Sequence, residues 1–134
     1  MASNIVHTTG NRKTSVARAT LKKGKGNLQI NDQDMKDFVN NFVLQLKIRE
    51  PFIISGLEGK YDVSVNVFGG GQNTQVEAIR QAIARALVEV TGDEDLRDRL
   101  EKYDRSLLVA DSRFKEMKKP NNSHARAKRQ KSYR

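Results

Sequence analysis

The sequence predicts an α+β fold, in which helices pack on a small β-sheet, followed by an extended basic tail. Residues 61–67 alternate strictly between polar and apolar side chains, with three valines on one face, which is typical of a half-buried strand. Residues 76–90 place apolar side chains along one helix face. Beyond Asp111 the apolar pattern is lost. We therefore expect a globular domain over residues 1–111 and a tail over residues 112–134.

The fold is expected to begin with a β-hairpin. Residues 14–21 contain Thr, Val, Ala and Leu side chains that favour a strand, although Ser15 and Arg18 interrupt the alternation. A glycine-bracketed turn follows at residues 24–26, and residues 27–31 then alternate polar with apolar side chains. We predict that these two segments pair, with Lys25 at the basic tip.

Two helices are predicted before the strand at residues 61–67. From Asp32 onward, apolar residues recur at the spacing of an amphipathic helix, at Met35, Phe38, Val39, Phe42, Val43 and Leu46. Pro51 suits the first turn of a second, short helix that Gly56 would end. The apolar residues expected to be buried in this short helix are Phe52, Ile53 and Ile54.

Helical signals dominate after the triple glycine at residues 69–71. Thr74, with Glu77 three residues later, is a capping-box signal for a helix that Gly92 would end. Asp93 is a suitable N-cap for another helix up to Tyr103, with Leu96 and Leu100 on one face. Residues 107–109 could form a short strand or a buried turn. The segment after them cannot bury enough apolar surface to fold alone.

Positive charge is concentrated at the two ends of the chain, whose formal net charge is +9. Residues 1–26 contain six Lys or Arg and no acid, and residues 112–134 contain nine against Glu116 alone. The stretch between them holds ten basic and fifteen acidic residues. A polyanion would therefore be bound by the ends, because each phosphate contact releases condensed counterions. A tail that only solubilises the protein is the alternative.

Composition also limits the class of protein. The chain has no cysteine, which excludes disulfides and thiolate metal sites. Neither a signal peptide nor an apolar run of membrane-spanning length is present, so we expect a soluble protein that is not exported.

The triple glycine could approach a phosphate closely through its backbone N–H groups, helped by the N-terminus of the following helix. Neither a Walker loop nor a dinucleotide-binding fingerprint is present, because the required lysine and the required glycine spacing are missing. The two interpretations that remain are a simple turn and a contact with the RNA backbone.

Catalysis finds little support in the sequence. The two histidines, His7 and His124, are both predicted to lie in mobile ends, where no rigid surroundings would hold an acid or base. The acids at 93–95 and 98 favour the dipole of a helix N-terminus and are interpreted as structural.

Two basic segments have compositions suited to RNA. Residues 12–15 place two cations before two hydroxyls at the start of a strand, which suits phosphate oxygens. The cations of residues 126–134 are spaced closely enough to meet successive phosphates, and Tyr133 could stack on a base. A solvated strand edge and a nuclear-localisation signal are the respective alternatives.

Five motifs resemble the family of small-subunit ribosomal protein S9, called S16 in eukaryotes, and together they span nearly the whole chain. They are GNRKTSVARA at 10–19, GKGNLQIN at 24–31, GGG at 69–71, AIRQAIARAL at 78–87 and RAKRQKSYR at 126–134. Residues 102–113 and the ending QKSYR are similar to the archaeal and eukaryotic branch, and the short length favours the archaeal type.

The resemblance implies a four-stranded sheet with helices packed on it, like the second domain of ribosomal protein S5. It also implies a place in the head of the small subunit of cytoplasmic ribosomes. The implied partners are the 3′ major domain of the rRNA, the anticodon loop of P-site tRNA and neighbouring head proteins, with no membrane. No catalytic residue, metal or cofactor is expected.

Site residues follow from the resemblance and the basic segments together. Those expected to contact rRNA are Arg12, Lys13, Thr14, Arg18, Lys25, Gly69, Gly70, Gly71, Arg113, Lys118, Lys119, Arg126 and Lys128. Those expected to contact tRNA are Arg129, Lys131, Ser132, Tyr133 and Arg134. Thr74 is expected to cap its helix instead. Two rival functions are an RNA-processing enzyme or phosphotransferase, which would need an ordered acid, base or metal cluster, and a general nucleic-acid chaperone.

Overall fold

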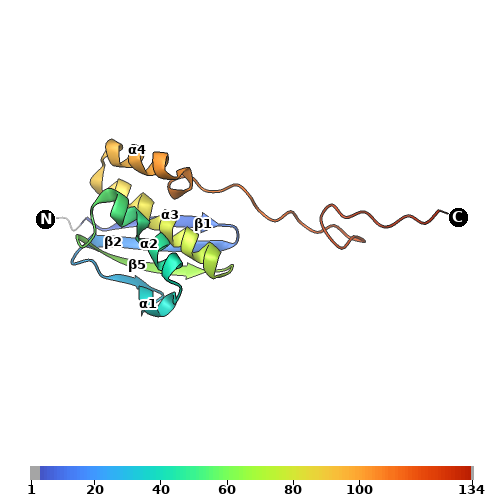
Figure 1. Ribbon diagram of the computed structural model, residues 1–134, viewed down its shortest axis with the longest axis horizontal. Coiled ribbons are helices and arrows are strands. Elements are labelled where there is room, and N and C mark those ends of the chain that lie inside the picture. The colour runs from blue at the N-terminus through green and yellow to red at the C-terminus, as the bar shows by residue number, and fades with distance from the viewer. Residues whose placement is uncertain (1–3, 134) are drawn as a thin grey trace.

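The computed structural model describes residues 4–133, in which an α+β domain is followed by an extended C-terminal segment (Figure 1). The predicted fold class is thus confirmed. In chain order the elements are β1 (Val6–Arg12), β2 (Ser15–Lys23), β3 (Leu28–Ile30), β4 (Gln33–Asp34), α1 (Met35–Phe38), α2 (Phe42–Ser55), β5 (Tyr61–Phe68), α3 (Gln72–Thr91), α4 (Glu94–Tyr103) and the 3₁₀ turn η1 (Arg105–Leu107).

The sheet has five strands in the order β1-β2-β5-β3-β4, so the expectation of four was wrong. The additional strand β4 is only two residues long, and it pairs with β3 across a tight turn at Asn31-Asp32. Both turn residues adopt the left-handed conformation, with φ of 50° and 63°, which Asn and Asp tolerate better than most residues. This turn also means that no helix begins at Asp32.

The predicted pairing of residues 14–21 with residues 27–31 is also wrong. β2 pairs antiparallel with both β1 and β5, whereas β3 pairs parallel with β5. The segment at 24–27 is therefore a crossover, held by Asp62 of β5, whose Oδ1 accepts the backbone N–H groups of Lys25, Gly26 and Asn27 at 2.9–3.0 Å. The true hairpin joins β1 to β2 through Lys13 and Thr14.

The helical region before β5 is divided differently from the prediction. α1 ends at Phe38, and Asn41 caps α2 by accepting the N–H of Val43 at 3.0 Å, so the expected single helix is two. Pro51 is buried in the interior of α2, so the predicted short helix that begins at Pro51 is wrong. Gly56 ends α2 as predicted. The burial expected for Ile53 is wrong, because that side chain is exposed.

The core lies between α3 and the inner face of the sheet. Val63, Val65 and Val67 of β5 are buried as predicted, and they pack with the alanines and isoleucines of α3. α3 passes so close to β1 that a Cβ built on Gly10 would lie 2.1 Å from the carbonyl oxygen of Ala78. The small residues of β1 and α3 thus allow a close backbone approach that larger side chains would prevent.

α4 packs beside α3 through a second apolar cluster, which contains Leu96, Leu100 and Leu107. Leu107 belongs to η1 and is buried, whereas Val109 is 42% exposed, so residues 107–109 form neither a strand nor a fully buried turn. Asp93 caps α4 as predicted, by accepting the N–H of Asp95 at 2.9 Å. None of the helices within residues 4–133 is both long and apolar enough to span a lipid bilayer.

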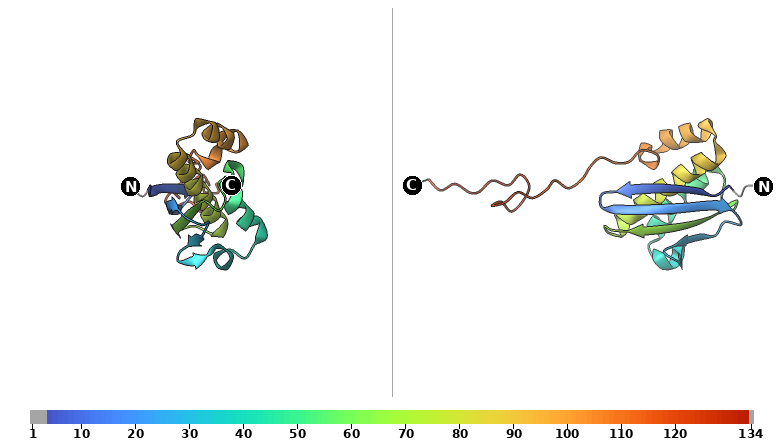
Figure 2. Two further views of the ribbon diagram at one scale, coloured as in Figure 1. Left: turned by 90° about the vertical axis from the view of Figure 1, so that its left-hand side faces the viewer. Right: turned by 180° about the vertical axis from the view of Figure 1, so that it is seen from behind.

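All helices lie behind one face of the sheet, and the opposite face is uncovered when the molecule is seen from behind (Figure 2). Residues 112–133 contain no helix or strand, and nearly all of them are exposed. They extend away from the end of the sheet at which the β1–β2 hairpin turns (Figure 1).

Candidate nucleic-acid interface

Two parts of the chain that are far apart in the sequence meet at the end of the sheet nearest the tail: the hairpin turn at 13–14, and the triple glycine at 69–71 with the first turn of α3 that follows it. Ser15 joins them, although its side chain is fully buried. Its hydroxyl donates to the carbonyl of Gly69 at 2.9 Å and lies 2.7 Å from the hydroxyl of Thr74. The exposed residues Lys13 and Thr14 are therefore held beside the glycine loop.

Glycine is required at two positions of this loop. Gly69 and Gly70 have φ of 81° and 62°, which favours glycine. A Cβ on Gly69 would lie 2.4 Å from the carbonyl oxygen of Thr14, and one on Gly70 would lie 2.1 Å from the Ser15 hydroxyl. The glycines therefore serve close packing against the hairpin, and their outer surface remains exposed.

The first turn of α3 presents backbone N–H groups at this surface. Its N-cap is Gly71, and Gln72 and Asn73 are exposed. The first N–H groups of a helix have no partner within the helix and carry the positive end of its dipole. No acid lies in the first turn of α3 to neutralise this end. The loop is therefore suited to an anionic group.

Thr74 stabilises the start of α3 from inside the helix. Its hydroxyl accepts the N–H of Gly71 at 3.0 Å and lies 2.9 Å from the Gly71 carbonyl. The predicted capping box is wrong in detail, because the helix begins two residues before Thr74 and Glu77 does not complete the box. Glu77 instead pairs with Arg12.

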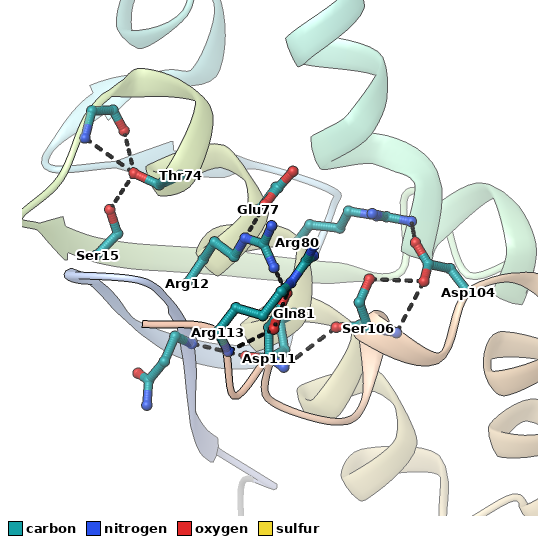
Figure 3. A network of polar contacts seen from close by, with 12 residues as sticks. Arg12, Ser15, Thr74, Glu77, Arg80, Gln81, Asp104, Ser106, Asp111 and Arg113 are labelled. Atoms are coloured by element: carbon teal, nitrogen blue, oxygen red, sulfur yellow. Dashed lines mark hydrogen bonds and ion pairs between the residues drawn. The ribbon is translucent and has the colours of Figure 1, made fainter. Parts of the chain in front are cut away.

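Arg12 is not a free phosphate ligand in this structure. Its Nε lies 2.8 Å from Glu77 Oε2, its Nη1 pairs with Asp111, and its side chain is only 19% exposed (Figure 3). Asp111 also binds Arg113, through hydrogen bonds of 2.8–3.1 Å. The base of the tail is thus attached to the hairpin, which brings the tail to the same end of the domain as the glycine loop.

Side chains of α3 hold the segment that leads to the tail. Gln81, which is buried, donates to the carbonyl of Ser106 at 3.3 Å and accepts the N–H of Asn11 at 2.8 Å (Figure 3). Arg85 donates to the carbonyls of Leu108 and Thr9 at 3.0 and 2.9 Å. The course of the chain from η1 to Asp111 is therefore fixed against α3.

A groove of about 610 Å³ lies beside this segment. Its charged lining residues are balanced, with four cations and four acids: Arg12, Lys47, Arg80, Arg113, Glu50, Glu77, Asp104 and Asp111. Arg80 lies 2.8 Å from Glu50 and 2.9 Å from Asp104. Because the three arginines pair with the four acids and the charges balance, the groove offers little attraction to a phosphate chain.

The predicted cations of the tail are exposed, although some are paired. Glu116, the only acid in residues 112–133, lies 2.8 Å from Arg126 and 3.6 Å from Lys119. Exposed ion pairs of this kind contribute about 0–1 kcal/mol, so they can be exchanged for phosphate at little cost. Lys118, Lys128, Arg129, Lys131, Ser132 and Tyr133 are also exposed, while Arg134 lies outside the described residues.

Two other predicted contacts lie away from the glycine loop. Arg18 is on the uncovered face of β2, with its guanidinium 5.9 Å from the centre of the Phe68 ring. Lys25 belongs to the crossover at the opposite end of β5, where Asp62 accepts three N–H groups. Hydrogen bonds from the N–H groups of Asn27, Lys25 and Gly26 hold the pKa of Asp62 below its usual range.

The histidines and acids do not assemble a recognisable catalytic or metal centre. His7, expected in a mobile end, instead lies in β1 with Nδ1 3.1 Å from the Thr20 hydroxyl. Burial, the largest influence, raises the pKa of Asp104, but hydrogen bonds from Ser106 and Arg80 outweigh it and the pKa is lowered. Within residues 4–133, no three His, Cys, Asp or Glu side chains gather as a metal site.

The residues that sequence reasoning missed are the ones that assemble the surface. Ser15 was predicted only as an interruption in a strand and as a hydroxyl suited to phosphate, and Gln81 was named only within the motif at 78–87. One signal for Gln81 is that Ala78, Ala82 and Ala84 lie near it on the helix, where a buried polar side chain needs partners.

Comparisons with known proteins agree with one another. The chain matches the family described as ribosomal protein S9/S16 over residues 10–134. It is 48% identical to the small ribosomal subunit protein uS9 of Halobacterium salinarum, over 97% of this chain and 99% of that protein. It is 44% identical to the protein of the same name from Methanococcus maripaludis, over 97% and 98%.

Proposed function

Because the chain belongs to the ribosomal protein S9/S16 family, we propose that it is a non-enzymatic constituent of the small ribosomal subunit in the cytoplasm. In this role it binds rRNA through the hairpin, the glycine loop and the tail. The last residues of the tail contact the anticodon loop of P-site tRNA. Proteins of the subunit head are its other neighbours.

One observation carries the proposal: the basic tail leaves the domain beside the glycine loop and the N-terminus of α3. The ion pairs of Arg12 with Glu77 and Asp111 hold this arrangement. A phosphate chain that meets the helix N-terminus and Lys13 can therefore continue onto the tail. In the tail the cations outnumber acids by nine to one.

The rRNA contacts proposed at the globular end are Lys13, Thr14 and the backbone of Gly69 to Gly71. Arg12 has a different role, because its charge is already satisfied by two acids. Arg18 and Lys25 meet RNA at other surfaces. In the tail, the rRNA contacts are Arg113, Lys118, Lys119, Arg126 and Lys128, which precede the proposed tRNA contacts from Arg129 to Arg134.

Truncation of residues 131–134 tests the tRNA contact. Small subunits reconstituted with the truncated protein should assemble normally but lose P-site tRNA faster. A matched control replaces Arg97 and Arg99, two exposed cations of α4, by alanine and thus removes the same charge. Equal tRNA dissociation from truncated and full-length subunits would refute the contact.

Removal of residues 112–134 tests the rRNA contact. The salt dependence of rRNA binding should fall by a slope of about 0.7–0.9 for each phosphate that the tail neutralises. Sucrose-gradient cosedimentation separates the rival functions, since a general chaperone would not associate stoichiometrically with small subunits. An unchanged slope would argue against phosphate binding along the tail.

A further inference from the structure

We propose that the uncovered face of the sheet binds a single-stranded segment of RNA, with Phe68 stacking on an unpaired base and Arg18 and Lys22 facing its phosphates. This surface adjoins the glycine loop at Phe68 and extends from there along the sheet. The inference rests on the RNA-binding role proposed above and adds a second binding surface to it.

The strand register places polar side chains in rows across this face. Thr9, Arg18 and Asn66 form one row across β1, β2 and β5. His7, Thr20, Ser64 and Gln29 form a second row, which continues onto β3. Since alternate residues of these strands are buried beneath α3, every side chain in the rows points away from the helices, and the face is open (Figure 2).

Phe68 is the large aromatic side chain on this face, and its neighbour on β2 is the half-buried Val16. Its ring is 54% exposed at the end of β5, directly before the glycine loop. The Arg18 guanidinium lies 5.9 Å from the ring centre and restricts the position of the ring on that side. A flat ring beside a guanidinium on an open sheet is suited to stacking on an unpaired base.

The charge of the face selects RNA over a basic or apolar partner. Arg18 and Lys22 are exposed, and Asp62 is the one acid on this face of β1, β2 and β5. One oxygen of the Asp62 carboxylate, Oδ1, already accepts the three N–H groups of the crossover. Asp34 lies on β4, at the far edge of the sheet. A phosphate beside Phe68 would therefore meet Arg18, whereas Lys22 and Asp62 face each other six residues away along β2 and β5.

A hollow of about 240 Å³ extends the surface away from Phe68. It lies between β2, β5 and β3, and its lining includes Thr20, Lys22, Gln29 and Ser64. Phe68 follows Ser64 by four residues of β5, which corresponds to about 13 Å along an extended strand. A single-stranded RNA lying along β5 could reach both the ring and the hollow.

The test replaces Phe68 by leucine, which keeps an apolar side chain and removes the ring. Binding of a short single-stranded RNA that contains 2-aminopurine is followed by fluorescence quenching. We expect affinity to fall about 5- to 100-fold, as for the loss of one stacked base, with loss of quenching and an unchanged salt slope. Arg18→Ala should lower both the affinity and the slope.

Phe42→Leu is the matched control, because Phe42 is 69% exposed but lies on α2, behind the sheet. This variant should bind RNA as the wild type does. Unchanged RNA affinity and quenching for Phe68→Leu would overturn the inference. If this variant were also incorporated less well into subunits, the partner of Phe68 would be a neighbouring protein. Deletion of residues 112–134 in a parallel experiment separates the two proposals. If the deletion weakens RNA binding and Phe68→Leu does not, only the sheet surface is refuted. If neither variant weakens RNA binding, the proposed RNA-binding role is refuted as well.

Discussion

Gly10→Ala should strongly destabilise the domain. The substituted Cβ would lie 2.1 Å from the carbonyl oxygen of Ala78 and 2.7 Å from the backbone nitrogen of Ala82. Neither backbone atom can rotate away, so β1 and α3 must separate. Overpacking of this kind costs about 1–3 kcal/mol.

Separation would also weaken the hydrogen bonds between β1 and α3. The Thr8 hydroxyl donates to the Ala82 carbonyl at 2.7 Å, and the Asn11 N–H donates to Gln81 at 2.8 Å. Each such bond contributes about 0.5–1.5 kcal/mol net. We therefore expect the free energy of unfolding to fall by about 2–5 kcal/mol, a large part of the total for a small domain.

Urea denaturation followed by circular dichroism measures this loss. Gly71→Ala is the control, since a Cβ there would meet nothing within 4 Å and its φ of −108° suits any residue. Because Ala is a poorer N-cap than Gly, the control should lose no more than about 1 kcal/mol relative to the wild type. If Gly10→Ala were equally stable, the close approach of β1 and α3 would be wrong.

Three further predictions concern the polar contacts. Because the pKa of Asp62 is lowered in the folded state, its carboxylate stabilises the crossover above the ordinary value of 3.8, and this contribution is lost as pH falls through the lowered pKa. Asp62→Asn should therefore speed amide exchange of Asn27 at neutral pH, with a difference from wild type that shrinks on acidification; a constant difference would contradict this. Asp111→Asn should broaden the distance distribution between spin labels on two introduced cysteines, one in α4 and one at the base of the tail. Glu116→Gln, which lies farther along the tail, is the control and should leave this distribution unchanged. Ser15→Ala should lower the free energy of unfolding by about 1–2 kcal/mol and accelerate amide exchange in the glycine loop, and unchanged exchange would show that Ser15 does not order it.

The sequence predicted the parts of the fold that depend on local periodicity. The valines of β5, the helix ends at Gly56 and Gly92, and the Asp93 cap were all confirmed. The family and its archaeal type, inferred from motifs, were confirmed by the comparisons. The structural features among these depend on a few neighbouring residues, so they can be predicted without knowledge of the tertiary structure.

Strand pairing could not be predicted in the same way. Two alternating segments joined by a glycine turn resemble a hairpin, and only the tertiary structure shows that β5 lies between them. β1 was missed because α3 buries it through Gly10 and small polar residues, which carry no apolar alternation. The residue types of the candidate surface were predicted, but the role of Arg12 was not. Arg12 pairs with Glu77 and Asp111, and these acids are 65 and 99 residues away in the sequence, where no local pattern could indicate them.

The contacts of Gln81 and Arg85 with β1 have a consequence for the protein before it reaches RNA. β1 is one of the two edge strands of the sheet, and unpaired N–H and C=O groups on such a strand can template pairing with another chain. Gln81 occupies the N–H of Asn11, and Arg85 occupies the carbonyl of Thr9. The same side chains that direct the tail therefore also protect the free protein against edge-to-edge aggregation.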